Sequence, residues 1–330
     1  MENSLPSTYR ALAAKEDDKE ARIVDLSLSK PGKNQLLVKI SYAAINHSDV
    51  MIMNGLIRIT NSSPYLVGRE ASGEVVALGE DLKRSFNVGD RVLIHTIGSF
   101  AEYTLVDSDL AIKLPEHISL EDAASAIINP ATVVYMAELA EKGGHKAAIN
   151  TAASSSLGRL LIKLLKEKGI KTINIVRQDK YIEDLKREGA DYVLNSEAPD
   201  FEESFKEIAE KEQATISFDA TNVFADRLIK NQPANSTCYI YGMLGGGEIF
   251  MGKNDIKENG KRVTFLVYLL WLDELQASGD TERVFKEILK YLPTIFKVPV
   301  QKVYSLDQMF EACEYFSTHS TQGRVLIKLN

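Results

Sequence analysis

The chain has little cysteine. Its 330 residues include only two, Cys238 and Cys313. Two thiols cannot build a disulfide-rich scaffold, and their scarcity fits a reducing compartment. Long apolar runs are also missing, because the longest one, residues 265–272, is far shorter than the roughly 20 residues needed to cross a bilayer. We therefore expect neither a disulfide-stapled fold nor a membrane-inserted protein.

A surplus of basic residues is missing as well. Lys and Arg number 39 against 46 Asp and Glu, so the net charge is -7 and the pI is about 5.5. This balance argues against nucleic acid and anionic membrane surfaces as partners. The N-terminus has no cationic apolar leader, and acidic residues between positions 16 and 20 argue against a transit peptide. We expect a cytoplasmic protein, with import into an organelle by a route without a cleavable signal left open.

Glycine is scarce at the place where the chain otherwise resembles a phosphate-binding corner. Residues 146–150 are typical of a short buried strand, and residues 159–168 of a helix with four leucines on one stripe. A strand, a tight turn of small residues and a helix form the phosphate corner of dinucleotide folds. The N-terminus of such a helix offers free N–H groups and a positive dipole end to phosphates.

The turn departs from the GxGxxG pattern, whose glycines would fall on Ala153, Ser155 and Gly158. Only Gly158 remains, the glycine that allows close packing of helix on strand. The hydroxyls of Ser154, Ser155 and Ser156 could donate hydrogen bonds to phosphate. The alternative is that the turn only caps a helix, with a serine as N-cap.

The second strand of this unit, residues 171–176, is followed by Arg177. NAD-specific sites usually place an acidic residue near this point to hold the ribose 2′-OH. A guanidinium here, with Lys180 just beyond, instead suits a 2′-phosphate and favours NADPH. The alternative is a solvated basic start of a helix.

Length and patterning indicate two domains. A chain of this size is too long for one ordinary domain, and 45% hydrophobic with 26% charged residues is normal for a globular protein. The first third is β-rich, and its short strands suggest a partly open barrel. The predicted segments are 35–42, 73–79, 87–94 and 100–106.

The pattern changes near Ser119, which is placed to cap a helix, and residues 132–142 form a second helix. Strands and helices then alternate up to a last strand at 262–267, which predicts an α/β fold with a doubly wound parallel sheet. A final strand at 323–329 is expected to return to the N-terminal β domain. The expected domains are 1–128, completed by 269–330, and 129–268. The alternating segments are 147–150, 159–168, 172–176, 181–188, 192–194, 201–211, 216–220, 224–230 and 237–241.

This order resembles the medium-chain dehydrogenase/reductase superfamily, in its zinc-free branch of quinone oxidoreductases and 2-enoyl thioester reductases. The resemblance implies a GroES-like partly open β-barrel domain and a Rossmann domain. It also implies zinc-independent, NADPH-dependent transfer of hydride to a quinone, an α,β-unsaturated carbonyl or an enoyl thioester. The segments that carry it are 44–49, 67–74, 88–92, 100–103, 128–132, 151–158, 186–191 and 218–220.

Zinc enzymes of this superfamily carry a cysteine and a histidine near these motifs. Here Asn46 and Arg69 stand at those positions, and two cysteines cannot form the four-cysteine structural lobe. We therefore predict no metal. His47 and His95 are expected to be polar or core histidines rather than ligands.

The resemblance also implies a set of site residues. Asn46 matches the asparagine near the nicotinamide ring, and Asp49 the aspartate that braces its loop, although capping or a loop salt bridge would explain Asp49 equally well. Thr132 matches the threonine that contacts the carboxamide. Arg177 and Lys180 would meet the 2′-phosphate. The pyrophosphate would lie on Ser155, Ser156, Leu157 and Gly158, and the crevice would be lined by Tyr241, Gly242 and Met243.

Two departures weaken the case for catalysis. The tyrosine that enoyl thioester reductases use falls on Ile57, which cannot donate a proton. Leu266 and Val267 replace an aromatic pair of the family. Trp271 either walls the substrate pocket or is a buried core residue. Other candidate donors, none of them singled out by the sequence, are Tyr42, Tyr65 and Tyr268.

Two functions follow from these observations. The first is the NADPH-dependent oxidoreductase. The second is a catalytically silent family member, retained as a structural or binding subunit of a larger assembly. Relatives often dimerise by pairing strands of their Rossmann sheets. Residues 265–272 could serve that purpose in a homodimer, or form a plain buried last strand.

Overall fold

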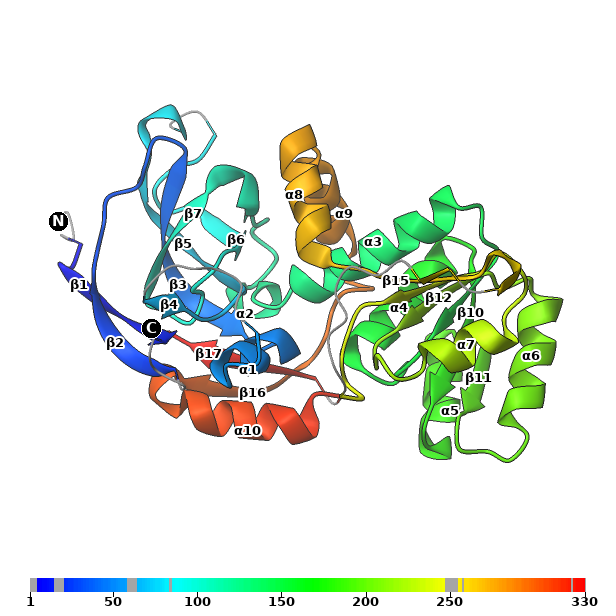
Figure 1. The fold of residues 1–330 in the computed structure, drawn as a ribbon. Coiled ribbons are helices and arrows are strands. Elements are labelled where there is room, and N and C mark those ends of the chain that lie inside the picture. Colours follow the sequence, from blue (N-terminus) through cyan, green and yellow to red (C-terminus); the bar gives the residue numbers. More distant parts are fainter. Residues whose placement is uncertain are drawn as a thin grey trace. The chain divides into compact units, whose positions relative to one another are not determined.

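The computed structural model describes residues 5–14, 21–57, 64–82, 85–246, 255–256, 258–321 and 323–329. The chain divides into two compact units (Figure 1). Unit 1 contains Met1–Asn129 and Gly279–Asn330, and unit 2 contains Pro130–Ser278. The expected bounds differ from this division at residue 129 and over residues 269–278, so the functional domain limits stay a prediction.

Unit 1 is built on two sheets. A three-stranded sheet has the order β2-β1-β4, and a larger one has the order β16-β17-β3-β5-β6-β8, with β7 also paired to β3. The final strand β17 pairs antiparallel with β3, so the predicted return of the C-terminal strand is confirmed. The strands are β1 (Thr8–Ala14), β2 (Arg22–Ser27), β3 (Gln35–Ala44), β4 (Tyr65–Leu66), β5 (Glu70–Leu78), β6 (Arg91–His95), β7 (Tyr103–Asp107), β8 (Ala111–Lys113), β16 (Val300–Ser305) and β17 (Arg324–Lys328).

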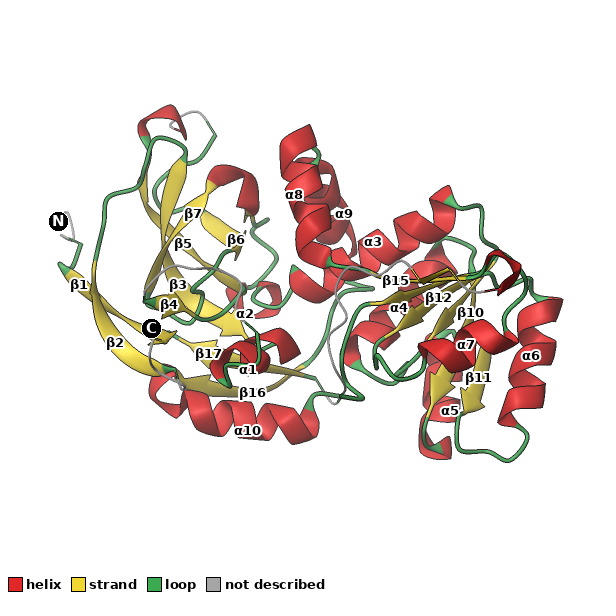
Figure 2. Cartoon of the chain, viewed as in Figure 1, coloured by secondary structure: helices red, strands yellow, loops and turns green. Residues whose placement is uncertain are grey.

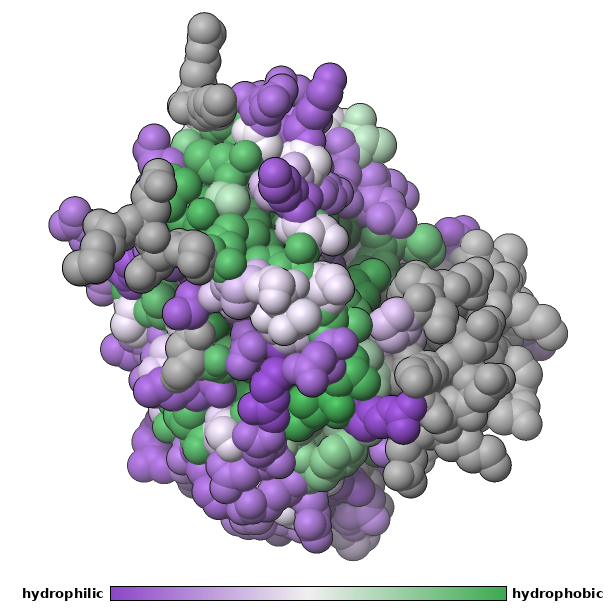
Figure 3. All heavy atoms as spheres, turned by 90° about the vertical axis from the view of Figure 1, so that its left-hand side faces the viewer, coloured by the Kyte–Doolittle hydropathy of each residue, from purple (hydrophilic) through white to green (hydrophobic). Residues whose placement is uncertain are grey.

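The helices of unit 1 are short. Ser119 caps α2 as predicted, because its side chain accepts from the Asp122 N–H. A core of buried apolar side chains, with Leu36, Ile40 and Phe100 among the largest, fills the unit. Figure 3 views this unit from the β1–β2 side and shows apolar residues among hydrophilic ones. The helices are α1 (His47–Met53), α2 (Leu120–Ala123), α9 (Thr281–Tyr291) and α10 (Met309–His319), with short 3-10 turns at Glu80–Leu82, Ser108–Leu110 and Leu306–Gln308.

Unit 2 contains one sheet of order β11-β10-β9-β12-β13-β15-β14. The first six strands are parallel and only β14 runs antiparallel to its neighbour. This is the doubly wound Rossmann order predicted from the alternating segments. The strands are β9 (Ala147–Asn150), β10 (Lys171–Val176), β11 (Tyr192–Asn195), β12 (Ile216–Asp219), β13 (Thr237–Ile240), β14 (Asp255–Ile256) and β15 (Arg262–Phe265).

Helices flank this sheet (Figure 2). In α4 the four leucines predicted to share a stripe are all buried, which explains why this segment folds as a helix against the sheet. The helices are α3 (Ile128–Lys142), whose first two residues belong to unit 1, α4 (Ser156–Glu167), α5 (Ile182–Glu188), α6 (Phe201–Lys211), α7 (Ala225–Asn231) and α8 (Tyr268–Ser278), with 3-10 turns at Asp179–Tyr181 and Glu258–Gly260.

The apolar run 265–272 differs from its expected form. The last parallel strand stops at Phe265, and Tyr268 already begins α8. Trp271, Leu272 and Leu275 are buried while Leu270 is exposed, a spacing that fits a helix and not a strand. The strand predicted at 262–267 is present as β15 but ends two residues early, and residues 268–272 are helical, so the run is not one continuous strand. Its part in a homodimer stays a prediction. In the parts of the chain that the structure describes, no helix is long and apolar enough to cross a membrane.

Candidate functional site

The turn between β9 and α4 is compact and capped. Ala152 has φ 45°, a left-handed conformation that is uncommon outside glycine, and its carbonyl accepts from the Ser155 N–H at 2.8 Å. Ser155 is the N-cap of α4, since its hydroxyl oxygen accepts from the Gly158 N–H at 3.1 Å. The capping role that the sequence left open thus belongs to Ser155.

Gly158 lies where the first turn of α4 meets the preceding loop. A Cβ at this position would come within 2.7 Å of the Ala153 carbonyl oxygen and 2.9 Å of the Ala152 carbonyl oxygen. Both contacts are to backbone, which cannot yield cheaply. The close packing expected of this glycine is therefore present, even though the other two glycines of the pattern are missing.

The serines around Gly158 surround the start of the helix. Ser154, Ser156 and Leu157 are half-buried, and the Ser154 carbonyl accepts from the Arg159 Nε at 3.1 Å. The first amides of a helix have no acceptor within the helix. A start of α4 built in this way fits the phosphates of a dinucleotide, which bind to such amides.

Two buried asparagines tie this helix to the sheet, and the sequence analysis missed both. Asn150 ends β9 and is fully buried, and its Nδ2 donates to the Gly158 carbonyl at 3.1 Å and to Asn174 Oδ1 at 3.3 Å. Asn174 in turn donates to Thr172 Oγ1 at 2.8 Å. Amides within or at the end of otherwise apolar strands were the available signal, because a buried amide needs partners.

A fully buried carboxylate, Asp219 at the end of β12, gathers the neighbouring loops. Its Oδ1 accepts from the Thr151 hydroxyl at 2.8 Å and from the Thr221 N–H and hydroxyl at 2.9 and 2.7 Å. Its Oδ2 accepts from the Phe224 N–H at 3.2 Å. These bonds satisfy both buried carboxyl oxygens, and they join the turn after β9 to the loop after β12.

Tyr241, Gly242 and Met243 follow β13 at the same edge of the sheet, and all three are half-buried. The Tyr241 N–H donates to the Asp219 carbonyl at 2.9 Å, and a Cβ on Gly242 would come within 2.7 Å of the Ala220 carbonyl oxygen. The Tyr241 hydroxyl is buried without a hydrogen-bond partner among the described residues. Burial raises the pKa of this phenol far above its usual value.

The two predicted cations follow β10. Arg177 comes directly after the strand and Lys180 lies in the short 3-10 turn Asp179–Tyr181, and both are exposed. The Lys180 Nζ lies 4.9 Å from the centre of the Tyr181 ring. This edge, at the carboxyl ends of the strands, is where ligands bind in open α/β sheets.

Thr132 and Trp271 are the other predicted site residues of unit 2. Thr132 is buried on α3. Trp271 is 6% exposed and stacks on Tyr135, with ring centres 4.5 Å apart and an angle of 5° between the planes. This shows the packing role that the sequence left open for Trp271. Its assignment as a wall of the substrate pocket stays a prediction.

In unit 1, Asn46 is held by a buried carboxylate. Glu70, which is fully buried, accepts from Asn46 Nδ2 at 2.8 Å through Oε1. Its Oε2 accepts from the N–H groups of Ile127 and Ile128 at 2.8 and 2.9 Å. A negative charge at this place also interacts favourably with the positive dipole end of α3. Glu70 therefore orients Asn46 against the start of that helix, a positioning role that the sequence analysis missed.

Asp49 is the most perturbed acid of unit 1. It is fully buried, its Oδ2 accepts from the Asn46 N–H at 2.8 Å, and its Oδ1 has no hydrogen-bond partner in the described chain. Burial raises its pKa to about 7, opposed by the hydrogen bond from Asn46 and by the charge of Arg69. The Asp49 side chain thus both caps α1 and braces the loop that carries Asn46.

Arg69, at the position of the family histidine, is 4% exposed and its Nη2 lies 3.5 Å from His95 Nε2. Burial, with the charge of Arg69, lowers the pKa of His95 to about 3, so this histidine is neutral at physiological pH. His47 packs against Phe316 at 4.8 Å between ring centres. Within the described residues no group of three or more His, Cys, Asp and Glu is placed to hold a metal ion.

The predicted site residues thus fall into two groups. Asn46 and Asp49 are in direct contact within unit 1. The turn 151–158, Arg177 and the segment 241–243 gather at the carboxyl edge of the unit 2 sheet. Ile57 is half-buried and packs against the core of unit 1, so an apolar side chain is accommodated at this position.

Comparison with known proteins agrees with this architecture. Residues 32–116 match the family model of the alcohol dehydrogenase GroES-like domain, and residues 156–277 match that of the zinc-binding dehydrogenases. A solved structure from Mesorhizobium loti, provisionally named an NADPH:quinone reductase, superposes with a TM-score of 0.85. The two sequences are 28% identical, and the superposition covers 99% of this chain and 100% of the M. loti chain.

The chain belongs to the medium-chain dehydrogenase/reductase superfamily, in its zinc-free branch. Among curated relatives, prostaglandin reductase-3 of Mus musculus is 26% identical over 326 residues, with 92% of this chain and 84% of that protein covered. A "Probable quinone oxidoreductase" of Schizosaccharomyces pombe is 34% identical over 155 residues. That match spans 46% of either protein, less than half the length of the relative.

Proposed function

We propose that the protein is an NADPH-dependent oxidoreductase that acts without zinc. The observation that carries this proposal is the corner between β9 and α4, where Gly158 lets the first turn of the helix pack against the loop backbone and Ser155 caps the start of the helix. The name of the M. loti relative, an NADPH:quinone reductase, supports the same cofactor. When bound, the reduced nicotinamide would supply hydride for the reaction.

The residues of unit 2 account for binding of such a cofactor. The start of α4 would receive the pyrophosphate on its amides and on the hydroxyls of Ser154 and Ser156. Arg177 and Lys180, exposed after β10, would pair with a 2′-phosphate. Tyr241 brings a buried hydroxyl without a partner in the described chain to the same edge of the sheet. A buried donor of this kind favours a ligand that satisfies it.

For the acceptor we propose a quinone, ahead of an enone or enoyl thioester. A quinone that receives a hydride needs one proton to become a hydroquinone, and water can supply it. Reduction of an enoyl thioester would benefit from an acid at position 57, and Ile57 cannot serve as one. The protein would then contribute mainly orientation and exclusion of water.

The second candidate is a catalytically silent subunit of a larger assembly, and Ile57 together with the serine-rich turn favours it. Titration of the purified protein with NADPH and NADH, followed by oxidation assays with quinones and enones, separates the two. Micromolar NADPH binding with turnover supports the oxidoreductase, and tight binding without turnover supports the silent subunit. If neither cofactor binds, both the proposed cofactor and the proposed enzyme activity are refuted. A homodimer stays a prediction, which sedimentation velocity would test.

A matched variant strengthens this experiment. Arg177→Gln removes the charge but keeps a polar side chain of similar reach, so we expect about tenfold weaker NADPH binding and unchanged NADH binding. Arg187→Gln serves as the control, because Arg187 is an exposed residue of α5 that pairs with Asp184. Equal weakening of both cofactors by Arg177→Gln would contradict the role given to this residue.

A further inference from the structure

The loop proposed to bind the 2′-phosphate contains a carboxylate of its own. Asp179 lies between Arg177 and Lys180 in the sequence and, like them, is exposed. It stands near the distance from Gly158 at which NAD-specific sites place the acidic residue that holds the ribose 2′-OH. A free carboxylate here would repel a 2′-phosphate and would compete for the two cations.

The structure shows where this carboxylate is held. Asn195, the last residue of β11, donates from Nδ2 to Asp179 Oδ1 at 2.8 Å. The Asn195 Oδ1 accepts from the Glu197 N–H at 3.0 Å. A side-chain amide can donate to the carboxylate through its NH2 group and accept from a backbone N–H through its oxygen. Asn195 therefore fastens Asp179 to the end of the neighbouring strand.

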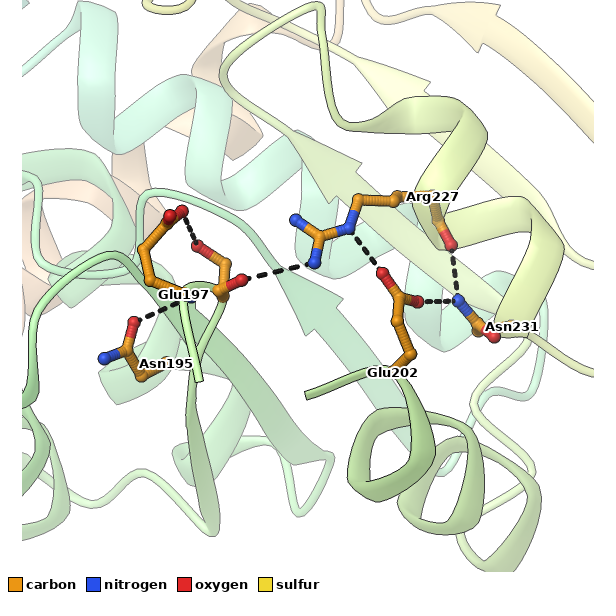
Figure 4. A network of polar contacts seen from close by, with 6 residues as sticks. Asn195, Glu197, Glu202, Arg227 and Asn231 are labelled. Carbon is orange, nitrogen blue, oxygen red and sulfur yellow. Dashed lines mark hydrogen bonds and ion pairs between the residues drawn. The ribbon is translucent and has the colours of Figure 1, made fainter. Parts of the chain in front are cut away.

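Asn195 is itself held in place by the loop that follows it. It pairs in register with Val176, the residue before Arg177, and the Ser196 N–H donates to the Val176 carbonyl at 2.8 Å. The Ser196 carbonyl accepts from Arg227 Nη2 at 3.2 Å. Figure 4 shows this connection from Asn195 and Glu197 to Arg227.

Arg227 is a rigid anchor for this loop. Its guanidinium carbon lies 4.7 Å from the ring centres of both Phe201 and Phe224. Its Nε donates to Glu202 Oε1 at 2.5 Å, and Glu202 also accepts from Asn231 (Figure 4). A guanidinium in contact with two aromatic rings and bonded to a carboxylate has restricted freedom. The loop bearing Asn195 is thus supported from the side of α6 and α7.

We propose that Asn195 is a specificity-determining positioning residue, which keeps the Asp179 carboxylate bonded toward β11 and thereby leaves Arg177 and Lys180 to bind a 2′-phosphate. This proposal rests on the proposed NADPH function and deepens it. The selectivity then depends on two layers. Arg177 and Lys180 attract the phosphate, and the Asn195 amide holds the Asp179 carboxylate that would otherwise neutralise them.

The test uses fragments of the cofactor that carry no nicotinamide, so that no turnover is needed. Binding of adenosine 2′,5′-bisphosphate and of 5′-AMP is measured by isothermal titration for the wild type, Asn195→Ala, Asp179→Asn and the double variant. We expect Asn195→Ala to weaken the bisphosphate about fivefold, because exposed charges interact modestly, and to leave 5′-AMP unchanged. In the double variant, which has no carboxylate to release, the bisphosphate affinity returns close to that of the wild type.

The control is Asn231→Ala, which removes a partner of Glu202 but leaves the bond between Asn195 and Asp179 intact. Equal loss for both ligands in Asn195→Ala, or no rescue in the double variant, would overturn the proposal and leave Asn195 a structural residue. A wild type that binds both fragments equally would overturn it too. Discrimination and rescue without NADPH turnover would support Asn195 while refuting the oxidoreductase, so the two failures can be told apart.

Discussion

Replacing Asp49 by asparagine should change how the stability of unit 1 depends on pH. The carboxylate is fully buried, uses Oδ2 to accept from the Asn46 N–H, and has a pKa raised to about 7 by burial. An asparagine keeps an acceptor for Asn46 and cannot ionise. The variant therefore removes one titration from the folded state with little change in shape.

The sign and size follow from linkage. The pKa of an ordinary aspartate is 3.8, and that of Asp49 in the folded chain is about 7, so between these values the folded state holds a proton that the unfolded state has released. Its contribution to stability falls as pH rises, by about 1.4 kcal/mol per pH unit, and levels off above pH 7 at a total of about 4 kcal/mol. Asp49→Asn should thus gain stability relative to wild type by this slope between about pH 4 and 7.

His95 acts in the opposite direction. Its folded pKa of about 3 lies below the ordinary histidine value of 6.5, so on acidification the unfolded state takes up a proton that the folded state does not. Stability from this group is complete above pH 6.5 and falls as pH drops below it. In the wild type the two slopes oppose each other over about pH 4 to 6.5. Without the Asp49 carboxyl, the loss of stability that His95 causes on acidification is no longer offset.

The assay must report on unit 1 alone. In a Cys238→Ser background, Cys313 of α10 is the one remaining thiol, and it is buried in unit 1. Its labelling at increasing urea concentrations gives the free energy of unfolding of this unit at pH 5, 6, 7 and 8. Asp25→Asn, at an exposed carboxylate on β2, is the control. A difference between Asp49→Asn and wild type that stays constant from pH 5 to 7 would refute the reasoning.

Three further predictions concern other features. Gly158→Ala should destabilise unit 2 by about 1–3 kcal/mol and weaken NADPH binding at least about tenfold, because its Cβ meets backbone. Urea unfolding followed by the single tryptophan checks this, and unchanged stability would contradict it. Arg227→Ala should cost about 1–3 kcal/mol of unit 2 stability, and Arg227→Lys less, because a lysine keeps part of the contact with Phe201 and Phe224. Equal losses in the two variants would argue against a stabilising role for the contacts with the two rings. Ile57→Tyr should raise the rate of enoyl thioester reduction and leave quinone reduction unchanged, as steady-state assays would show. A parallel change in both rates would point to a packing effect instead.

The sheet of unit 2 was predictable because its short apolar strands alternate regularly with patterned helices and are bounded by turn residues. The strand 171–176 and the helix 201–211 have the limits that the sequence predicted. The run 265–272 was not predictable, since a short apolar stretch suits a buried strand or a buried helix equally. The structure divides it between β15 and α8.

The candidate site was predictable only where sequence neighbours create it. Gly158 and Arg177 stand at recognisable distances along a strand–turn–helix pattern. The bond from Asn195 to Asp179 and the bonds from Glu70 to Asn46 and α3 join residues on different elements. Their register depends on how the strands pair, which composition and periodicity do not specify. Glu70 begins β5 and Asn195 ends β11, so polar residues at the ends of strands were the local sign of these bonds.

Unit 1 has a consequence for the order in which the protein is made. Its β17 pairs with β3, so Lys328 lies opposite Tyr42, and nearly the whole chain must leave the ribosome before that pairing can form. Unit 2 is one uninterrupted stretch, residues 130–278, and needs nothing that is translated later. We expect unit 2 to fold during synthesis and unit 1 only afterwards, because contacts between distant residues form late. During that interval the strands of residues 1–129 have unpaired edges, which makes this segment the part of the nascent protein that most needs protection from aggregation.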